Sequence, residues 1–94
     1  MNEQLVTRHA KLRAQQRAIP PLIVDWLETY GAIEVDHRGA EIRYFDQKAR
    51  RRLGKVVGHQ VVGLLGRLLD AYAVVGKSGA VITVGHRIKR INRH

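Results

Sequence analysis

The chain has 94 residues, no cysteine and a formal net charge of +9 at neutral pH. This length fits one domain, residues 1–94, with a small core, and the lack of cysteine excludes disulfides, zinc–thiolate sites and a cysteine nucleophile. The first residues lack the pattern of a signal peptide, and charges interrupt the most apolar stretch, residues 56–75. We therefore expect a cytoplasmic protein without a membrane span or a membrane partner.

The positive charge is concentrated in the second half of the sequence. Residues 1–46 contain six Lys/Arg and seven Asp/Glu, a net charge of −1, whereas residues 47–94 contain eleven Lys/Arg and one acid, a net charge of +10. Two basic runs without neighbouring acids favour a polyanionic partner, and a merely solvated surface is the alternative. The sequence thus predicts binding of nucleic acid by Lys48, Arg50, Arg51, Arg52, Lys55, Lys89, Arg90 and Arg93.

Two helices are predicted in the N-terminal third of the chain. The first covers residues 7–18 with Thr7 as its N-cap, and the second covers residues 21–30. Pro21 at the first helical position and Gly31 after the last one are typical of helix ends. The apolar residues of the second helix fall within about 140° of arc, so this helix is expected to cover the core.

Two hairpins are predicted further along the chain. Alternation of apolar and polar residues over 33–45, around a turn at 37–40, predicts a hairpin with one solvated face. The second hairpin covers residues 71–87, and β-branched residues flank its two-residue turn at 78–79.

The segment between the hairpins is predicted to be helical, with Asp46 as its N-cap. Four glycines within residues 54–66 weaken a continuous helix, and a kink or break is expected near Gly58. The complete order, α-α-β-β-α-β-β, predicts an α+β fold. In this fold the N-terminal helices pack on a small antiparallel sheet of about four strands.

The first helix brings basic residues to its predicted inner face. At 100° per residue, Arg13 and Arg17 point to the apolar side with His9 beside them, whereas Arg8 and Lys11 point to solvent. A buried guanidinium needs a carboxylate, a carbonyl or a ligand phosphate. Two interpretations are open: the arginines reach the helix edge and pair with acids, or they line a cleft beside the sheet that binds phosphate.

The last strand adds residues suited to proton transfer and phosphate binding. Alternation places His86 on the core face of this strand and Arg87 on the other face. A histidine at a strand end is often structural, yet its pKa suits proton transfer near neutral pH. Cleavage of RNA by its own 2′-hydroxyl needs a proton acceptor, cations at the phosphate and a proton donor. The residues predicted to carry such catalysis are His9, Arg13, Arg17, His86 and Arg87.

The sequence points to no metal and no cofactor. Its histidines and acids lack the spacing of metal ligands, and no nucleotide-binding loop motif is present. Tyr44 and Tyr72 are assigned to the inward side of the sheet, where they are core residues that could assist a neighbouring site.

Two stretches of the sequence resemble a bacterial family of small uncharacterised domains. They are Arg8-His9-Ala10-x-x-Arg13-x-x-x-Arg17-x-Ile19 and Tyr72-x-Val74-x-x-x-x-Gly79-x-Val81-Ile82-Thr83-Val84. This family is thought to be distantly related to the BrnT and RelE type II toxins. The resemblance therefore implies a RelE-like fold, a metal-independent endoribonuclease activity by analogy, and an acidic antitoxin protein as a partner. The long Gly-rich segment 47–70 departs from the compact toxins.

Three functions remain as alternatives. A toxin-type endoribonuclease would act on RNA rather than DNA. A non-catalytic nucleic-acid-binding or regulatory domain would use residues 50–52 and the C-terminal tail. A protein-interaction module would form a homodimer through residues 53–69, and its charge would serve only solubility.

Overall fold

The computed structural model describes residues 6–87 of the chain. Its elements are α1 (Arg8–Gln16), α2 (Pro21–Tyr30), β1 (Ala32–Val35), β2 (Glu41–Tyr44), α3 (Gln47–Val57), α4 (His59–Leu65), the 3₁₀ helix η1 (Gly66–Asp70), β3 (Ala71–Val75) and β4 (Val81–His86). Helices combined with an antiparallel sheet confirm the predicted α+β class. Its likeness to RelE stays a prediction.

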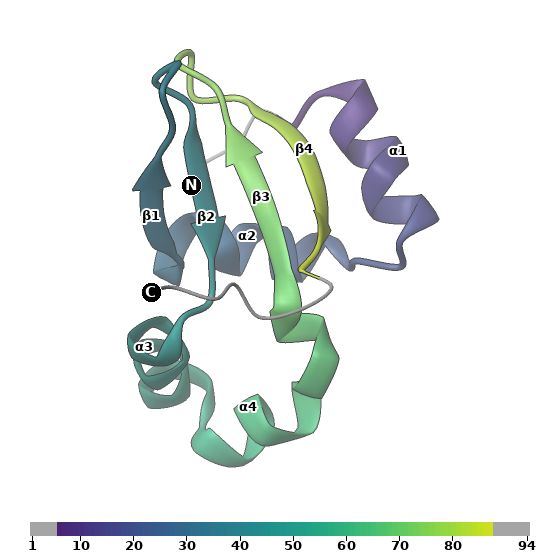
Figure 1. The fold of residues 1–94 in the computed structure, drawn as a ribbon. Coiled ribbons are helices and arrows are strands. Elements are labelled where there is room, and N and C mark those ends of the chain that lie inside the picture. Colours follow the sequence, from purple (N-terminus) through teal and green to yellow (C-terminus); the bar gives the residue numbers. More distant parts are fainter. Residues whose placement is uncertain (1–5, 88–94) are drawn as a thin grey trace.

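The four strands form one antiparallel sheet in the order β1-β2-β3-β4. Hairpins join β1 to β2 and β3 to β4, and α3, α4 and η1 connect β2 to β3. At the β4 edge, the Thr7 N–H donates to the Val81 carbonyl oxygen at 3.0 Å. In Figure 1, α2 crosses behind the strands and α1 packs against β4. The sheet therefore has a helix face, against which α1 and α2 pack, and an open face that no helix within residues 6–87 covers.

Local sequence explains where the helices begin and end. The Thr7 hydroxyl accepts the Ala10 N–H at 3.1 Å, and the Asp46 carboxylate accepts the Ala49 N–H at 2.8 Å, so both predicted N-caps are confirmed. α3 ends at Val57, and Gly58 after it has a φ of 101°, in a region that favours glycine. The predicted break near this residue is therefore confirmed.

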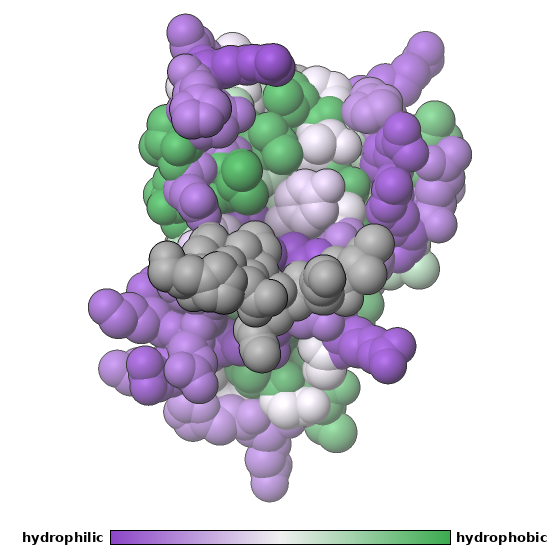
Figure 2. Space-filling view, viewed as in Figure 1, coloured by the Kyte–Doolittle hydropathy of each residue, from purple (hydrophilic) through white to green (hydrophobic). Residues whose placement is uncertain are grey.

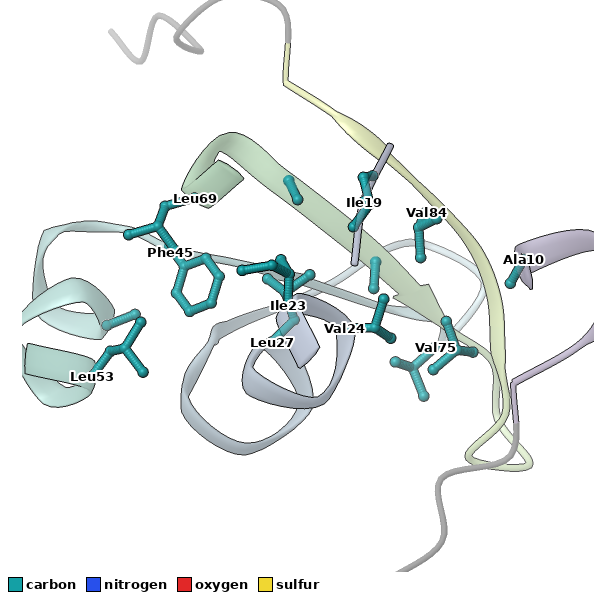
Figure 3. Packing of buried hydrophobic residues seen from close by; sticks show 14 residues of the cluster. Ala10, Ile19, Ile23, Val24, Leu27, Phe45, Leu53, Leu69, Val75 and Val84 are labelled. Carbon is teal, nitrogen blue, oxygen red and sulfur yellow. The ribbon is translucent and has the colours of Figure 1, made fainter. Parts of the chain in front are cut away.

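Apolar side chains fill the space between the helices and the helix face of the sheet. Figure 3 shows this core as one layer, with Phe45 between Leu53 of α3 and Ile23 of α2. Alternate residues of β3, beginning with Ala71 and Ala73, point into this layer. Two alanines on the central strand leave room for α2 to lie close to the sheet.

Both hairpins use the same type of loop. In loops 36–40 and 76–80, the first residue donates its N–H to the carbonyl of the fifth at 2.9 Å. The glycine at the fourth position, Gly39 or Gly79, has a φ of 86° or 91°. The two-residue turn predicted at 78–79 is wrong, because the loop includes the residues on both sides of it.

Two apolar segments are less buried than their patterns predict. Ile33 and Val35 of the edge strand β1 are 53% and 61% exposed, because α1 and α2 pack mainly on the other three strands. α4 contains no buried residue, and its Leu64 is 85% exposed. The homodimer through residues 53–69 stays a prediction. No helix within residues 6–87 is long and apolar enough to cross a membrane.

Candidate nucleic-acid interface

Two tyrosines lie side by side on the open face of the sheet. Tyr44 of β2 and Tyr72 of β3 are direct cross-strand partners, and both are partly exposed. Their predicted inward position is wrong. The alternation of β3 turns Ala71 and Ala73 toward the core and Tyr72 away from it. Aromatic rings therefore stand on the face of the sheet that the described helices leave uncovered.

Gly85 of β4 provides the space that the Tyr72 ring occupies. It lies directly opposite Tyr72 in the sheet. A Cβ atom at this position would lie 2.9 Å from Cε1 of Tyr72 and 3.0 Å from its hydroxyl oxygen. These distances are too short for any side chain, so the ring lies over the glycine and close to the β4 backbone.

Arg87 extends the aromatic surface. Its guanidinium carbon lies 4.2 Å from the centroid of the Tyr44 ring, which is a cation–π contact. Its backbone N–H donates to the Asp70 carbonyl oxygen at 2.8 Å. Arg87 thus lies on the open face, as the alternation of the last strand predicts.

The exposed side of α3 carries four cations. At 100° per residue, Lys48, Arg51, Arg52 and Lys55 fall within about 100° of arc, and all four are exposed. We call these four residues the α3 basic face. Figure 2 shows hydrophilic side chains gathered over α3, at the lower left, on the same side of the molecule as the open face.

The arginines at 50–52 do not all have the same role. Arg50 points to the other side of α3, donates to two main-chain carbonyl oxygens at 3.2 and 3.4 Å, and pairs with Asp70 at 3.2 Å. Arg52 donates to the carbonyl oxygen of Tyr30, the last residue of α2, at 2.9 Å. The Arg51 side chain makes no hydrogen bond or ion pair within the described chain. Arg50 and Arg52 therefore hold elements together, whereas Arg51 is available to a ligand.

Asp70 joins the α3 helix to the open face. Its carboxylate pairs with Arg50 of α3, and its carbonyl oxygen accepts the N–H of Arg87. Tyr44 is the last residue of β2, and α3 begins three residues later at Gln47. Asp70 therefore connects the side of α3 that carries Arg50, opposite the α3 basic face, to the end of the sheet that carries Arg87.

The arginines of α1 are less buried than the helical pattern predicts. Ala10 is fully buried and Ala14 is partly buried, whereas Arg13 is half-buried and Arg17 is exposed. The inward orientation predicted for Arg17 is therefore wrong. The two alanines let α1 approach β4 closely, and the longer side chains lie on its flanks. Arg13 Nε donates to His9 Nε2 at 3.5 Å on the helix surface.

His86 and Arg87 lie on opposite faces of the sheet. His86 Nε2 donates to the Arg17 carbonyl oxygen at 2.8 Å, which ties the end of β4 to the end of α1. Arg87 contacts Tyr44 on the open face. The five residues predicted to be catalytic are thus divided between the two faces. The predicted binding residues Lys89, Arg90 and Arg93 lie outside the described residues.

Comparisons with known proteins give no match that bears on this interface. The chain has no significant match to a protein-family model, to a curated protein or to a solved structure. Within residues 6–87, no group of three or more His, Asp or Glu side chains is placed to hold a metal ion.

Proposed function

We propose that the protein binds single-stranded RNA, with bases on the open face of the sheet and phosphates against the α3 basic face. The observation that carries this proposal is the cross-strand pair of Tyr44 and Tyr72 beside Arg87. No described helix covers this pair, and α3, which begins three residues after Tyr44, carries exposed cations.

Stacking on aromatic side chains favours single strands over duplexes. Bases of a single strand can be splayed onto a flat surface, whereas bases of a duplex are already stacked on each other. The ring of Tyr72 offers a platform on which a base can stack, as aromatic rings on the sheets of RNA-binding domains do. The planar guanidinium of Arg87 adds a further stacking surface and a donor for phosphate oxygens.

Electrostatics supports the same partner. The second half of the chain has a net charge of +10, and Lys48, Arg51 and Lys55 form no ion pair with any described residue. Cations of this kind contact the phosphates of any sequence, so the affinity is expected to depend strongly on salt and weakly on base order.

The test compares single-stranded and duplex RNA of the same length. Fluorescence anisotropy of a labelled 12-nucleotide strand (a length of roughly one OB-fold site) should show tighter binding than the duplex at 100 mM salt. Equal affinity for both forms would indicate binding by charge alone and would contradict the stacking proposal. A Lys11→Ala variant, altered on the exposed surface of α1, serves as the control and should bind as the wild type does.

Metal-independent cleavage of RNA is a second candidate, favoured by the His9–Arg13 contact. This exposed pair places an imidazole beside a cation, which is the combination that proton transfer at a phosphodiester requires. RNA incubated with and without EDTA should be cleaved equally by the wild type and more slowly by Arg13→Ala. Intact RNA at micromolar protein would exclude the activity and leave binding as the function.

A further inference from the structure

A second polar cluster lies on the helix face of the sheet, next to the two hairpin loops. It surrounds a cavity of about 320 Å³ whose lining includes Glu28 of α2, Glu41 and Arg43 of β2, and Lys77 of the second loop. Val75 of β3 adds an apolar surface to the same cavity. The cavity and the tyrosine pair are therefore on different faces of the sheet.

The carboxylate of Glu28 is buried without a full set of partners. Its side chain is 6% exposed, and no residue within 6–87 donates to its buried Oε2. Oε1 lies 4.0 Å from a nitrogen of Arg43, beyond hydrogen-bonding distance. Buried carboxylates are normally satisfied by donors, so this atom lacks a partner.

The nearest cation, Arg43, donates to other acceptors. Arg43 donates to the Glu41 carboxylate with two nitrogens, at 2.7 and 3.1 Å, and with the third to the Glu28 carbonyl oxygen at 2.7 Å. Burial raises the pKa of Glu28 against the opposing effect of Arg43, and the charges of Glu41 and Asp25 raise this pKa further. A ligand that donates hydrogen bonds to the Glu28 carboxylate would supply the partner that this group lacks.

The loop side of the cavity presents an available cation. The Lys77 side chain lies across Gly39, since a Cβ atom at Gly39 would be 2.7 Å from Lys77 Cε. Within residues 6–87 no carboxylate pairs with the Lys77 ammonium. Glu28, whose carboxylate lacks a donor, and Lys77, a cation without an ion pair among residues 6–87, thus both line the cavity.

We propose that this cavity binds a guanine nucleotide, with the base edge at Glu28 and the phosphate at Lys77. Guanine presents two adjacent N–H donors on its Watson–Crick edge, which a carboxylate accepts together. Adenine and cytosine place an acceptor beside their amino group, and a carboxylate repels that acceptor. A volume of about 320 Å³ is in the range of small-ligand sites.

Calorimetric titration of the full chain with GMP, AMP and inorganic phosphate tests this proposal. GMP is expected to bind at least about tenfold more tightly than AMP, and Glu28→Gln should remove that preference, since an amide oxygen accepts without the charge. Lys77→Gln should weaken GMP binding and leave guanosine binding unchanged. Lys11→Gln, which removes an exposed lysine from α1, is the matched control and should not alter either affinity.

Several outcomes would overturn the proposal. Equal affinity for GMP and AMP, tight binding of phosphate alone, or a Glu28→Gln variant that keeps the guanine preference would each exclude recognition of the base edge by this carboxylate. Loss of GMP binding in Tyr72→Ala with retention in Glu28→Gln would place the nucleotide on the open face instead. Thermal unfolding of both Glu28→Gln and Lys77→Gln confirms that the variants are folded during the titrations.

Discussion

The guanidinium of Arg87 lies 4.2 Å from the centre of the Tyr44 ring, while the preceding residue points to the opposite face of the sheet. Consecutive residues at the end of β4 therefore serve different surfaces. His86 fastens the strand to α1, and Arg87 reaches across β3 to β2. Arg87, Tyr44 and the neighbouring Tyr72 together form the flat surface to which we assign the bases of RNA.

The free cations of α3 should determine how binding responds to salt. Replacing Arg51 and Lys55 with Ala removes two phosphate contacts, so the slope of log affinity against log salt should become shallower by roughly 1.4 units for a single strand. Anisotropy titrations between 50 and 200 mM salt measure this slope. An unchanged slope would show that α3 does not contact the phosphates.

Arg50 should act on stability instead. Its Ala variant loses two hydrogen bonds to main-chain carbonyls and an ion pair with Asp70. The ion pair is about one-third to one-half exposed, so solvent screening makes it the smaller part. We expect the free energy of unfolding to fall by about 1–2 kcal/mol. Urea denaturation measures this change, and a variant as stable as the wild type would contradict the role given to Arg50.

The connection between α1 and α2 contains an alanine whose replacement by glycine should stabilise the fold. Ala18 has a φ of 54°, and the hydrogen bonds from Ala18 to Gln15 and from Ile19 to Ala14 form the usual C-terminal motif of a helix. Left-handed backbone is unfavourable for alanine, so Ala18→Gly should stabilise the fold by about 1 kcal/mol. The matched change Ala14→Gly, inside α1, should destabilise it by a similar amount. Thermal unfolding of both variants provides the comparison, and destabilisation by Ala18→Gly would refute the argument.

Glu28 should make stability depend on pH. Burial raises the pKa of Glu28 in the folded protein above 4.5. The contribution of Glu28 to folding stability is therefore complete below pH 4.5 and is lost as the pH rises through the pKa of the folded protein. Glu28→Gln removes this titration. The variant should match the wild type near pH 4 and be more stable near pH 7. Unfolding curves at both pH values measure the difference in stability. A wild type that is more stable than the variant at pH 7 would contradict the role given to Glu28.

Sequence patterns predict the elements well and the faces of some elements poorly. Caps such as Thr7 and Asp46 act through neighbours in the chain, so local sequence is sufficient to place them. The side of β3 that faces the core depends on which of its two sets of alternate residues packs on α2. Small alanines form that inner set, and the larger tyrosine of this strand lies outside.

The candidate site depended on contacts that the sequence does not encode locally. Arg50 and Arg52 belong to one basic run, yet both are held by carbonyl groups of distant elements. Helical periodicity places Glu28 opposite the apolar side of α2, yet its side chain is 6% exposed because Arg43 of β2 packs beside it. Helical and strand periodicity place a side chain on a face, but tertiary packing decides what that face meets.

Binding of single-stranded RNA by Tyr72 variants tests the central claim most directly. Tyr72→Phe keeps the ring and should bind as the wild type does, whereas Tyr72→Ala should lose about 1–3 kcal/mol of binding free energy, roughly 5- to 150-fold in affinity. Anisotropy with the same labelled strand, at one salt concentration and with both variants shown to be folded, measures the ratio. Equal affinity of Tyr72→Ala and the wild type would mean that bases do not stack on the open face, and the account would be wrong.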